Sequence, residues 1–158
     1  MRTNAVWWWV IGAVTATLVI LWAHAGVHAQ ATPRVATPAP PVTVEELGAL
    51  VEQARARFVA RDAAGVLVHV AEDYRSAGVT KPALREQLLA LYSLYDAVRA
   101  RIQVDQVQLV DGDAWVYTTG EVSGRLPIVG WVTVLSWQRE PEVARRQGAA
   151  WRLIGFQD

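Results

Sequence analysis

The sequence contains no cysteine, and this absence excludes several architectures. Neither a disulfide framework nor a cysteine-bound zinc site can form, so the folded part of the chain has to be stabilised by its apolar core. A lipid-modified N-terminus that depends on a cysteine is excluded as well. Histidine is also scarce, because His69 is the only histidine beyond residue 42, and no histidine metal cluster or triad can be assembled there. We therefore expect no metal and no cofactor.

Basic charge is scarce in the part of the chain that we expect to fold. From Thr43 to Asp158 the sequence has 13 Lys and Arg residues and 15 Asp and Glu residues, a net charge of −2. Nucleic-acid-binding proteins normally carry a positive face or stripe. The one local basic cluster, Arg145 and Arg146, is predicted to lie in a hairpin loop that also carries Glu140 and Glu142. We therefore exclude nucleic acid as a partner.

Residues 1–29 are predicted to direct the chain out of the cytoplasm. The stretch from Ala5 to Ala23 carries no charge, and its apolar run would cover about 26 Å as a helix, near the lower limit for a bilayer. Tryptophans at both ends are typical of a membrane helix, whereas the small residues Val27 and Ala29 are typical of a signal-peptidase site. Either a cleaved signal peptide or an inner-membrane anchor places the following domain outside the cytoplasm, periplasmic or secreted.

Residues 30–42 are predicted to be a proline-rich linker. Prolines lack an N–H donor and fix φ, so the segment from Ala31 to Pro41 is expected to be extended rather than a helix or a central strand. If the N-terminal segment is retained, this linker would hold the domain about 34 Å from the membrane. The domain itself is predicted over residues 43–158.

Three helices are predicted at the start of this domain. Thr43 and Glu46 have the spacing of a capping box, Asp62 is a helix-capping residue, and Thr80 precedes a proline in a first helical turn. The helices are predicted from Thr43 to about Arg61, from Ala63 to Ala71, and from Thr80 onward.

Beyond residue 101 the apolar period changes to two, which predicts strands. The four predicted strands are Ile102–Val110, Ala114–Val122, Val129–Arg139 and Ala150–Gln157. The apolar parity changes within the first of them, which predicts a β-bulge near Asp105 and Gln106. Asp111 and Gly112 predict a tight hairpin turn after it. Helices followed by strands indicate an α+β fold, with three N-terminal helices packed on one face of a curved, mainly antiparallel sheet.

This order of elements resembles the nuclear transport factor 2-like superfamily, including its SnoaL-like branch. The resemblance covers residues 43–158, and its most specific pieces are Gly112-Asp113-Ala114-Trp115-Val116 and Trp151-Arg152-Leu153. It implies a cone-shaped fold in which the sheet wraps a long helix and leaves an open pocket. The superfamily includes enzymes, dimerisation modules and assembly subunits, so the fold does not determine the function.

The isomerases of this superfamily imply a general base that this sequence lacks at the expected place. They use an aspartate in the extended piece after the second helix, with a tyrosine among the oxyanion donors. Here Asp73 precedes that piece, which begins with Tyr74 and contains no carboxylate. The candidate catalytic residues are therefore positional hypotheses only: Asp73 or Asp105 as base, and Tyr74 or Tyr117 as donor.

Aromatic residues at period two are candidates to line an apolar pocket. Parity places Trp115 and Tyr117 on one face of their strand and Trp131 and Trp137 on one face of theirs. The alternative is ordinary packing in the core or on the outer face, because aromatic residues are favoured in strands. The predicted pocket residues are Trp115, Tyr117, Trp131, Trp137 and Tyr92. His69, a lone imidazole on an apolar helix, is interpreted as a core residue.

A loop with apolar residues lies where a polar hairpin turn is expected. Leu126, Pro127, Ile128 and Val129 lie between glycines, and such a patch is typical of a contact surface when it is exposed. The alternative is that the strand continues through Ile128 and buries it. A partner protein of the envelope, a second copy in a homodimer, and the membrane are all open as occupants.

The leading hypothesis is an extracytoplasmic, non-enzymatic binding or assembly module with an apolar pocket for a small apolar ligand. The alternative is a SnoaL-like enzyme, an isomerase, cyclase or dehydratase, that acts on an apolar substrate by acid–base chemistry. A carboxylate beside a tyrosine hydroxyl in an apolar cavity would favour the enzyme, because such surroundings raise the pKa of a carboxyl group. The identity of the ligand and the oligomeric state do not follow from the sequence.

Overall fold

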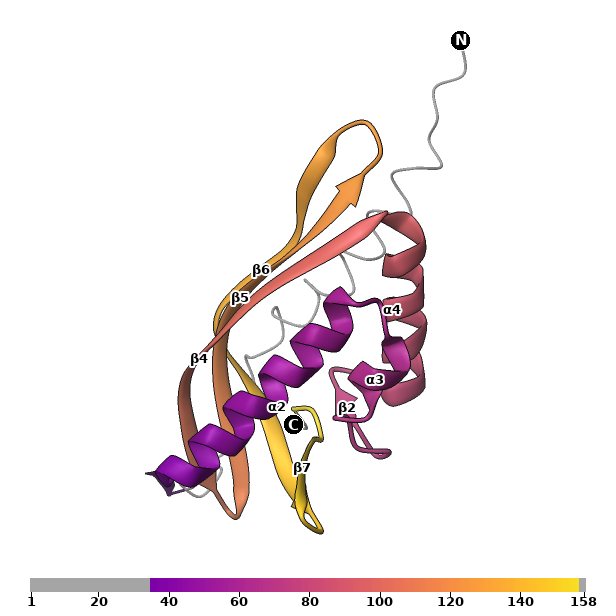
Figure 1. Cartoon of the computed structure of the whole chain (residues 1–158). Helices are drawn as coiled ribbons and strands as arrows, with labels where there is room; N and C mark the ends of the chain where they lie inside the picture. The colour runs from indigo at the N-terminus through magenta and orange to yellow at the C-terminus, as the bar shows by residue number, and fades with distance from the viewer. Residues whose placement is uncertain (1–34, 157–158) are drawn as a thin grey trace. The chain divides into compact units, whose positions relative to one another are not determined.

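The computed structural model describes residues 35–156, which form helices packed against one curved sheet (Figure 1). The sheet has the order β1-β4-β5-β6-β7 with antiparallel neighbours, and β2 and β3 form a separate ribbon. The helices are α2 (Pro41–Val59), α3 (Ala63–Leu67) and α4 (Lys81–Leu94), and the strands are β1 (Ala36–Pro38), β2 (Arg75–Ser76), β3 (Val79–Thr80), β4 (Ala97–Val110), β5 (Asp113–Leu126), β6 (Gly130–Gln147) and β7 (Ala150–Leu153). This confirms the predicted α+β fold. The predicted export segment, residues 1–29, lies outside the described residues.

The end of the predicted linker belongs to the domain. Residues 36–38 pair with β4 as an edge strand, and α2 begins at Pro41 rather than at Thr43. Pro38 in the edge strand and Pro41 in the first turn of α2 are both compatible with this structure, because each of these positions tolerates a missing N–H. Contacts define residues 34–158 as one compact unit with its own core.

The predicted capping box is wrong, and its two residues have other roles. The residue before α2 is Pro40, which makes no side-chain cap, and Thr43 is buried within the helix. The Glu46 carboxylate accepts a hydrogen bond from the Nε1 atom of Trp151 at 2.8 Å and also pairs with Arg146. Glu46 therefore ties α2 to β7 and to the end of β6.

The other two predicted caps are confirmed. The Asp62 side chain accepts a hydrogen bond from the Gly65 amide at 2.8 Å, and the Thr80 hydroxyl accepts one from the Ala83 amide. The second helix is shorter than predicted, because α3 ends at Leu67. The chain then turns, and Val70 forms a parallel bridge with Leu153 of β7. Pairing with the sheet edge replaces the last turn of the predicted helix.

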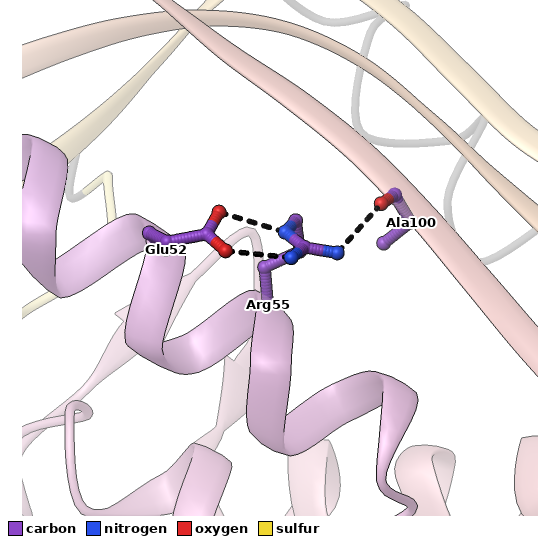
Figure 2. Close-up of polar contacts among 3 residues, drawn as sticks. All are labelled: Glu52, Arg55 and Ala100. Atoms are coloured by element: carbon purple, nitrogen blue, oxygen red, sulfur yellow. Dashed lines mark hydrogen bonds and ion pairs between the residues drawn. The ribbon is translucent and has the colours of Figure 1, made fainter.

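Figure 2 shows how α2 is joined to the open edge of β4. The Arg55 guanidinium donates from Nε and Nη2 to the Glu52 carboxylate at 2.7 and 2.6 Å, and from Nη1 to the Ala100 carbonyl at 3.4 Å. Among the described residues, β1 pairs with only three residues of β4, and an open strand edge favours aggregation unless it is covered. Arg55 covers this edge at Ala100.

Irregular pairing curves the sheet. The predicted bulge is confirmed, because the register of β4 with β5 shifts between Val104 and Gln106. Both residues of the predicted turn have positive φ, 53° at Asp111 and 88° at Gly112, as a tight hairpin requires. Two further shifts interrupt the pairing of β5 with β6. Bulges of this kind increase the local twist and bend, which lets the sheet curve about α2 (Figure 1).

The third predicted strand is much longer than expected, and the predicted loop around Arg145 and Arg146 is wrong. β6 continues to Gln147, so both arginines lie in the strand, where Arg145 forms a bidentate pair with Asp113 at 2.8 Å. From the sequence alone, Pro141 is typical of the end of a strand. In the structure it lies before the point where β7 joins β6, and an edge position tolerates proline.

The domain has three apolar clusters: one is formed by Ala71, Val143 and Ile154 with Trp115 packed against it, and the other two join the helices to the sheet or to one another. The first of these two joins Leu47 and Leu50 of α2 to Val116 of β5 and to Trp151. The second joins α3 and α4 around Leu67, Leu88 and Tyr92. Val116 therefore marks the face of β5 that is covered by α2. Alternation along the strand assigns the even-numbered positions of β5 to the helix side and the odd-numbered positions to the outer side.

Candidate functional site

The structure does not bring the five predicted pocket residues together. Trp115 and Tyr117 alternate with Val116 and lie on the outer side of β5. Trp131 pairs with Arg125 and is also outside, whereas Trp137 pairs with Gly120 on the helix side. The prediction that Trp131 and Trp137 share a face is wrong, because the register shift between Val122 and Ser123 leaves one residue of β6 unpaired and reverses the parity.

Each of these aromatic residues has its own packing partner. Trp115 meets Phe156 edge to face at 5.4 Å, and the Arg139 guanidinium lies 5.6 Å from the Tyr117 ring. The Nε1 atom of Trp137 donates to the Thr118 hydroxyl at 2.9 Å. Tyr92 is buried in the core between α3 and α4.

Both candidate bases, Asp73 and Asp105, are exposed. Asp73 follows α3 and lies close enough to Arg145 to contribute to the raised pKa of that arginine. Asp105 is the bulge residue of β4 and accepts a hydrogen bond from the Thr119 hydroxyl at 2.6 Å. Both carboxylates therefore lie at the surface rather than in an apolar pocket.

A half-buried glutamate with one carboxyl oxygen in the interior, which the sequence does not indicate, lies on the helix side of β6. Glu142 pairs with Val116, and its Oε1 atom is shut off from solvent with no hydrogen-bond partner among the described residues. Burial raises the pKa of Glu142 to about 7. Burial also raises the pKa of the Tyr74 hydroxyl, and the nearby Glu142 carboxylate contributes to that rise. Tyr74 is thus a predicted catalytic residue that lies near a perturbed carboxyl group.

Two other interior groups are perturbed without forming a site. Burial, and secondarily Asp62, raises the pKa of Tyr92 to about 12, and its hydroxyl has no partner among the residues described. Burial, with contributions from Arg152 and Arg57, lowers the pKa of His69. Within residues 35–156, no group of three or more potential metal ligands occurs.

Neither of two open clefts found among the described residues is lined by Glu142 or Tyr74. One, of about 540 Å³, lies beside α3 and the start of α4, with Lys81, Arg85 and Arg152 in its wall. Its Lys81 amine is already bound to Glu72 at 2.6 Å and to the Val70 carbonyl at 2.8 Å. The other, of about 580 Å³, lies over the bulge and is lined by Asp105, Thr119 and their neighbours. Neither is the apolar pocket expected from the sequence.

The β5–β6 hairpin ends in an exposed apolar loop, Leu126–Val129, here called the hairpin tip. Ile128 is 98% exposed and Val129 is 70% exposed, so the strand does not continue through Ile128 to bury it. Figure 1 shows the orange hairpin rising beyond the rest of the domain. Val35 at 77%, Val42 at 60% and Val68 at 58% are also exposed, and Ile128 has the highest exposure of the large apolar side chains among the described residues.

Two arginines and a tryptophan lie on the outer face directly behind the hairpin tip. Trp131 pairs with Arg125, and the Arg99 guanidinium stacks 3.5 Å from the centre of the Trp131 ring. Arg99 and Arg125 are exposed, and neither forms an ion pair with a carboxylate of residues 35–156. The end of the hairpin therefore combines an apolar loop with a cationic and aromatic collar.

No protein family and no curated protein matches this sequence. Solved structures do share its fold. Bd1075 of Bdellovibrio bacteriovorus is 14% identical over 70% of this chain with a TM-score of 0.56, and the match spans only 39% of Bd1075. A candidate scytalone dehydratase of Novosphingobium aromaticivorans is 10% identical, with 72% of this chain and 80% of that chain covered and a TM-score of 0.57.

A third structure carries the name of the superfamily. It is a candidate dehydratase of the nuclear transport factor 2-like family from Streptomyces avermitilis, 12% identical, with 73% of this chain and 94% of that chain covered and a TM-score of 0.58. The TM-scores establish the shared fold, whereas sequence identities this low leave the function open. The described domain has the curved-sheet cone fold of the nuclear transport factor 2-like proteins.

Proposed function

We propose that residues 34–158 form an extracytoplasmic binding and assembly module that docks through the hairpin tip and catalyses no reaction. The observation that carries this proposal is the exposure of the tip, with Ile128 at 98% and Val129 at 70%. Apolar side chains on a soluble domain are usually scattered singly, whereas contiguous ones mark contact sites. Here they are contiguous in sequence and lie at the end of a projecting hairpin (Figure 1).

The N-terminal strand and the hairpin tip lie at opposite ends of β4. The chain enters at Ala36, which pairs with Val110, whereas the hairpin tip lies beside Ala97 at the other end of β4. Thirteen residue steps along β4 correspond to about 43 Å. The hairpin tip thus lies at the opposite end of β4 from the N-terminal strand, and this separation supports the proposal.

A site-directed cross-link tests this proposal directly. Because the chain has no cysteine, Ile128→Cys introduces one unique thiol for a photoreactive maleimide, and Gln87→Cys on the exposed side of α4 is the matched control. The labelled full chain is incubated with the envelope fraction of the producing cell and irradiated. We expect a discrete adduct, to protein or to lipid, from position 128 and not from position 87. Equal labelling from both positions would contradict docking by the hairpin tip.

A second candidate function is supported by one specific observation, the buried Glu142 carboxyl near Tyr74. A carboxyl group with a pKa of about 7 can exchange a proton at neutral pH, and a tyrosine hydroxyl nearby can donate a hydrogen bond. This arrangement would suit acid–base chemistry on a small apolar molecule. Neither cleft described above is lined by Glu142 or Tyr74. The docking module is therefore the leading proposal.

Native mass spectrometry tests this second candidate. Residues 34–158 are purified gently from the producing cell as the wild-type domain and as Glu142→Gln. A defined added mass in the wild type that is absent from Glu142→Gln would favour the enzyme. Two bare spectra would count against it.

A further inference from the structure

The composition and shape of the hairpin tip identify its occupant. We propose that the hairpin tip inserts into the surface of a lipid bilayer that carries anionic headgroups. This inference rests on the proposed docking function and names the partner. It concerns the described residues 35–156 and adds to any attachment made by the N-terminal segment.

The shape of the surface favours a bilayer over a second protein. A stable protein–protein interface buries roughly 800 Å² on each partner, which a loop of four residues cannot supply. The outer sheet face behind the tip does not extend the apolar surface, because it presents polar residues such as Arg101, Glu121 and Ser123. A bilayer, in contrast, yields around a projecting loop and surrounds Ile128 and Val129 on all sides.

The collar behind the tip matches the layers of a membrane interface. Tryptophan prefers the headgroup level, and arginine keeps its guanidinium at the phosphates while its stem lies along apolar surface. Ile128 and Val129 lie at the tip itself. Trp131 lies next to them, with Arg99 stacked on its ring and Arg125 opposite it in the register. Apolar residues, then tryptophan with arginine, is the order of layers from the acyl chains to the phosphates.

Charge supports an anionic surface. Arg99 and Arg125 form no ion pair within residues 35–156, so their charges are available to headgroups. Glu121 lies farther from the tip, opposite Arg101 in the register, and accepts a hydrogen bond from Ser123 at 3.0 Å. Asp96 is an acidic residue at the tip end of the sheet, where its amide donates to the Arg125 carbonyl. The two arginines thus outnumber it at the tip.

Vesicle flotation tests the inference on residues 34–158, the unit that carries its own core. The probes are vesicles of phosphatidylcholine and vesicles of phosphatidylcholine mixed with phosphatidylglycerol. We expect the domain to bind the mixed vesicles, and we expect this binding to weaken in high salt. The affinity for these vesicles should fall at least about tenfold in Ile128→Asp and about fivefold in Arg99→Gln or Arg125→Gln. Val68→Asp, a substitution of another exposed apolar residue at 58%, should bind like the wild type. Circular dichroism confirms that each variant is folded.

The outcomes separate the two proposals. The membrane inference is overturned if the wild-type domain floats with neither type of vesicle. It is also overturned if Ile128→Asp floats as well as the wild type. If the position-128 cross-link then yields a protein adduct, docking by the hairpin tip stands and its occupant is a protein or a second copy. If position 128 also gives no specific adduct, both proposals fail.

Discussion

Replacing Glu142 with glutamine should abolish a large part of the pH dependence of stability. Burial raises the pKa of this carboxyl to about 7, against 4.5 as the ordinary value in the unfolded chain. The folded state therefore holds its proton more tightly, and the contribution is fully present below about pH 4.5 and is lost as the pH rises through 7. A difference of this size corresponds to roughly 3 kcal/mol of stability lost by pH 8.

Urea unfolding followed by tryptophan fluorescence measures this effect at pH 5 and pH 8. Glu142→Gln should be close to wild type at pH 5 and more stable by about 2–3 kcal/mol at pH 8. The lowered pKa of His69 acts in the opposite direction in acid, but it is common to both proteins and cancels in the difference. Glu86→Gln, on the exposed side of α4, is the control and should not change the slope. Equal slopes in wild type and Glu142→Gln would refute the account of Glu142 as a buried, protonated group.

Three further substitutions test the packing that positions the hairpin and the helices. Gly124→Ala would place a methyl group 2.3 Å from the Tyr95 ring, so we expect a loss of about 1–3 kcal/mol in urea unfolding. Asp62→Ala removes the cap of α3 and should cost about 1 kcal/mol, while Asp62→Asn should largely restore it. Glu46→Ala leaves the Trp151 indole N–H without its acceptor and should cost about 2 kcal/mol, whereas Glu46→Gln keeps an acceptor and should cost less. Losses below measurement error in all three would contradict the contacts described.

Local signals in the sequence were sufficient for most of the fold. The period-two pattern, the change of parity near Asp105 and the turn at Asp111 each depend on neighbouring residues, and the structure confirms them. The caps at Asp62 and Thr80 are local as well. The capping box failed because Pro41 provides a better helix start two residues earlier.

The candidate site depended on long-range features that a local pattern does not contain. Glu142 follows Pro141 in a charged stretch that has the composition of a loop, and only its pairing with Val116 reveals that it is turned toward the core. The one available signal was the parity of Glu142 with Ala144, which is buried. For the aromatic residues, a single register shift in β6 separated Trp131 from Trp137. The hairpin tip was identified from composition, and its exposure required the structure.

Fluorescence of one label at position 128 tests the central claim most directly. The absence of cysteine lets Ile128→Cys carry a single polarity-sensitive nitrobenzoxadiazole, with Gln87→Cys as the control position. On addition of mixed phosphatidylcholine and phosphatidylglycerol vesicles to the labelled domain, we predict a blue shift and a rise in emission at position 128 and no change at position 87. An unchanged spectrum at position 128, with vesicles and with the envelope fraction of the producing cell alike, would contradict a docking role for the hairpin tip.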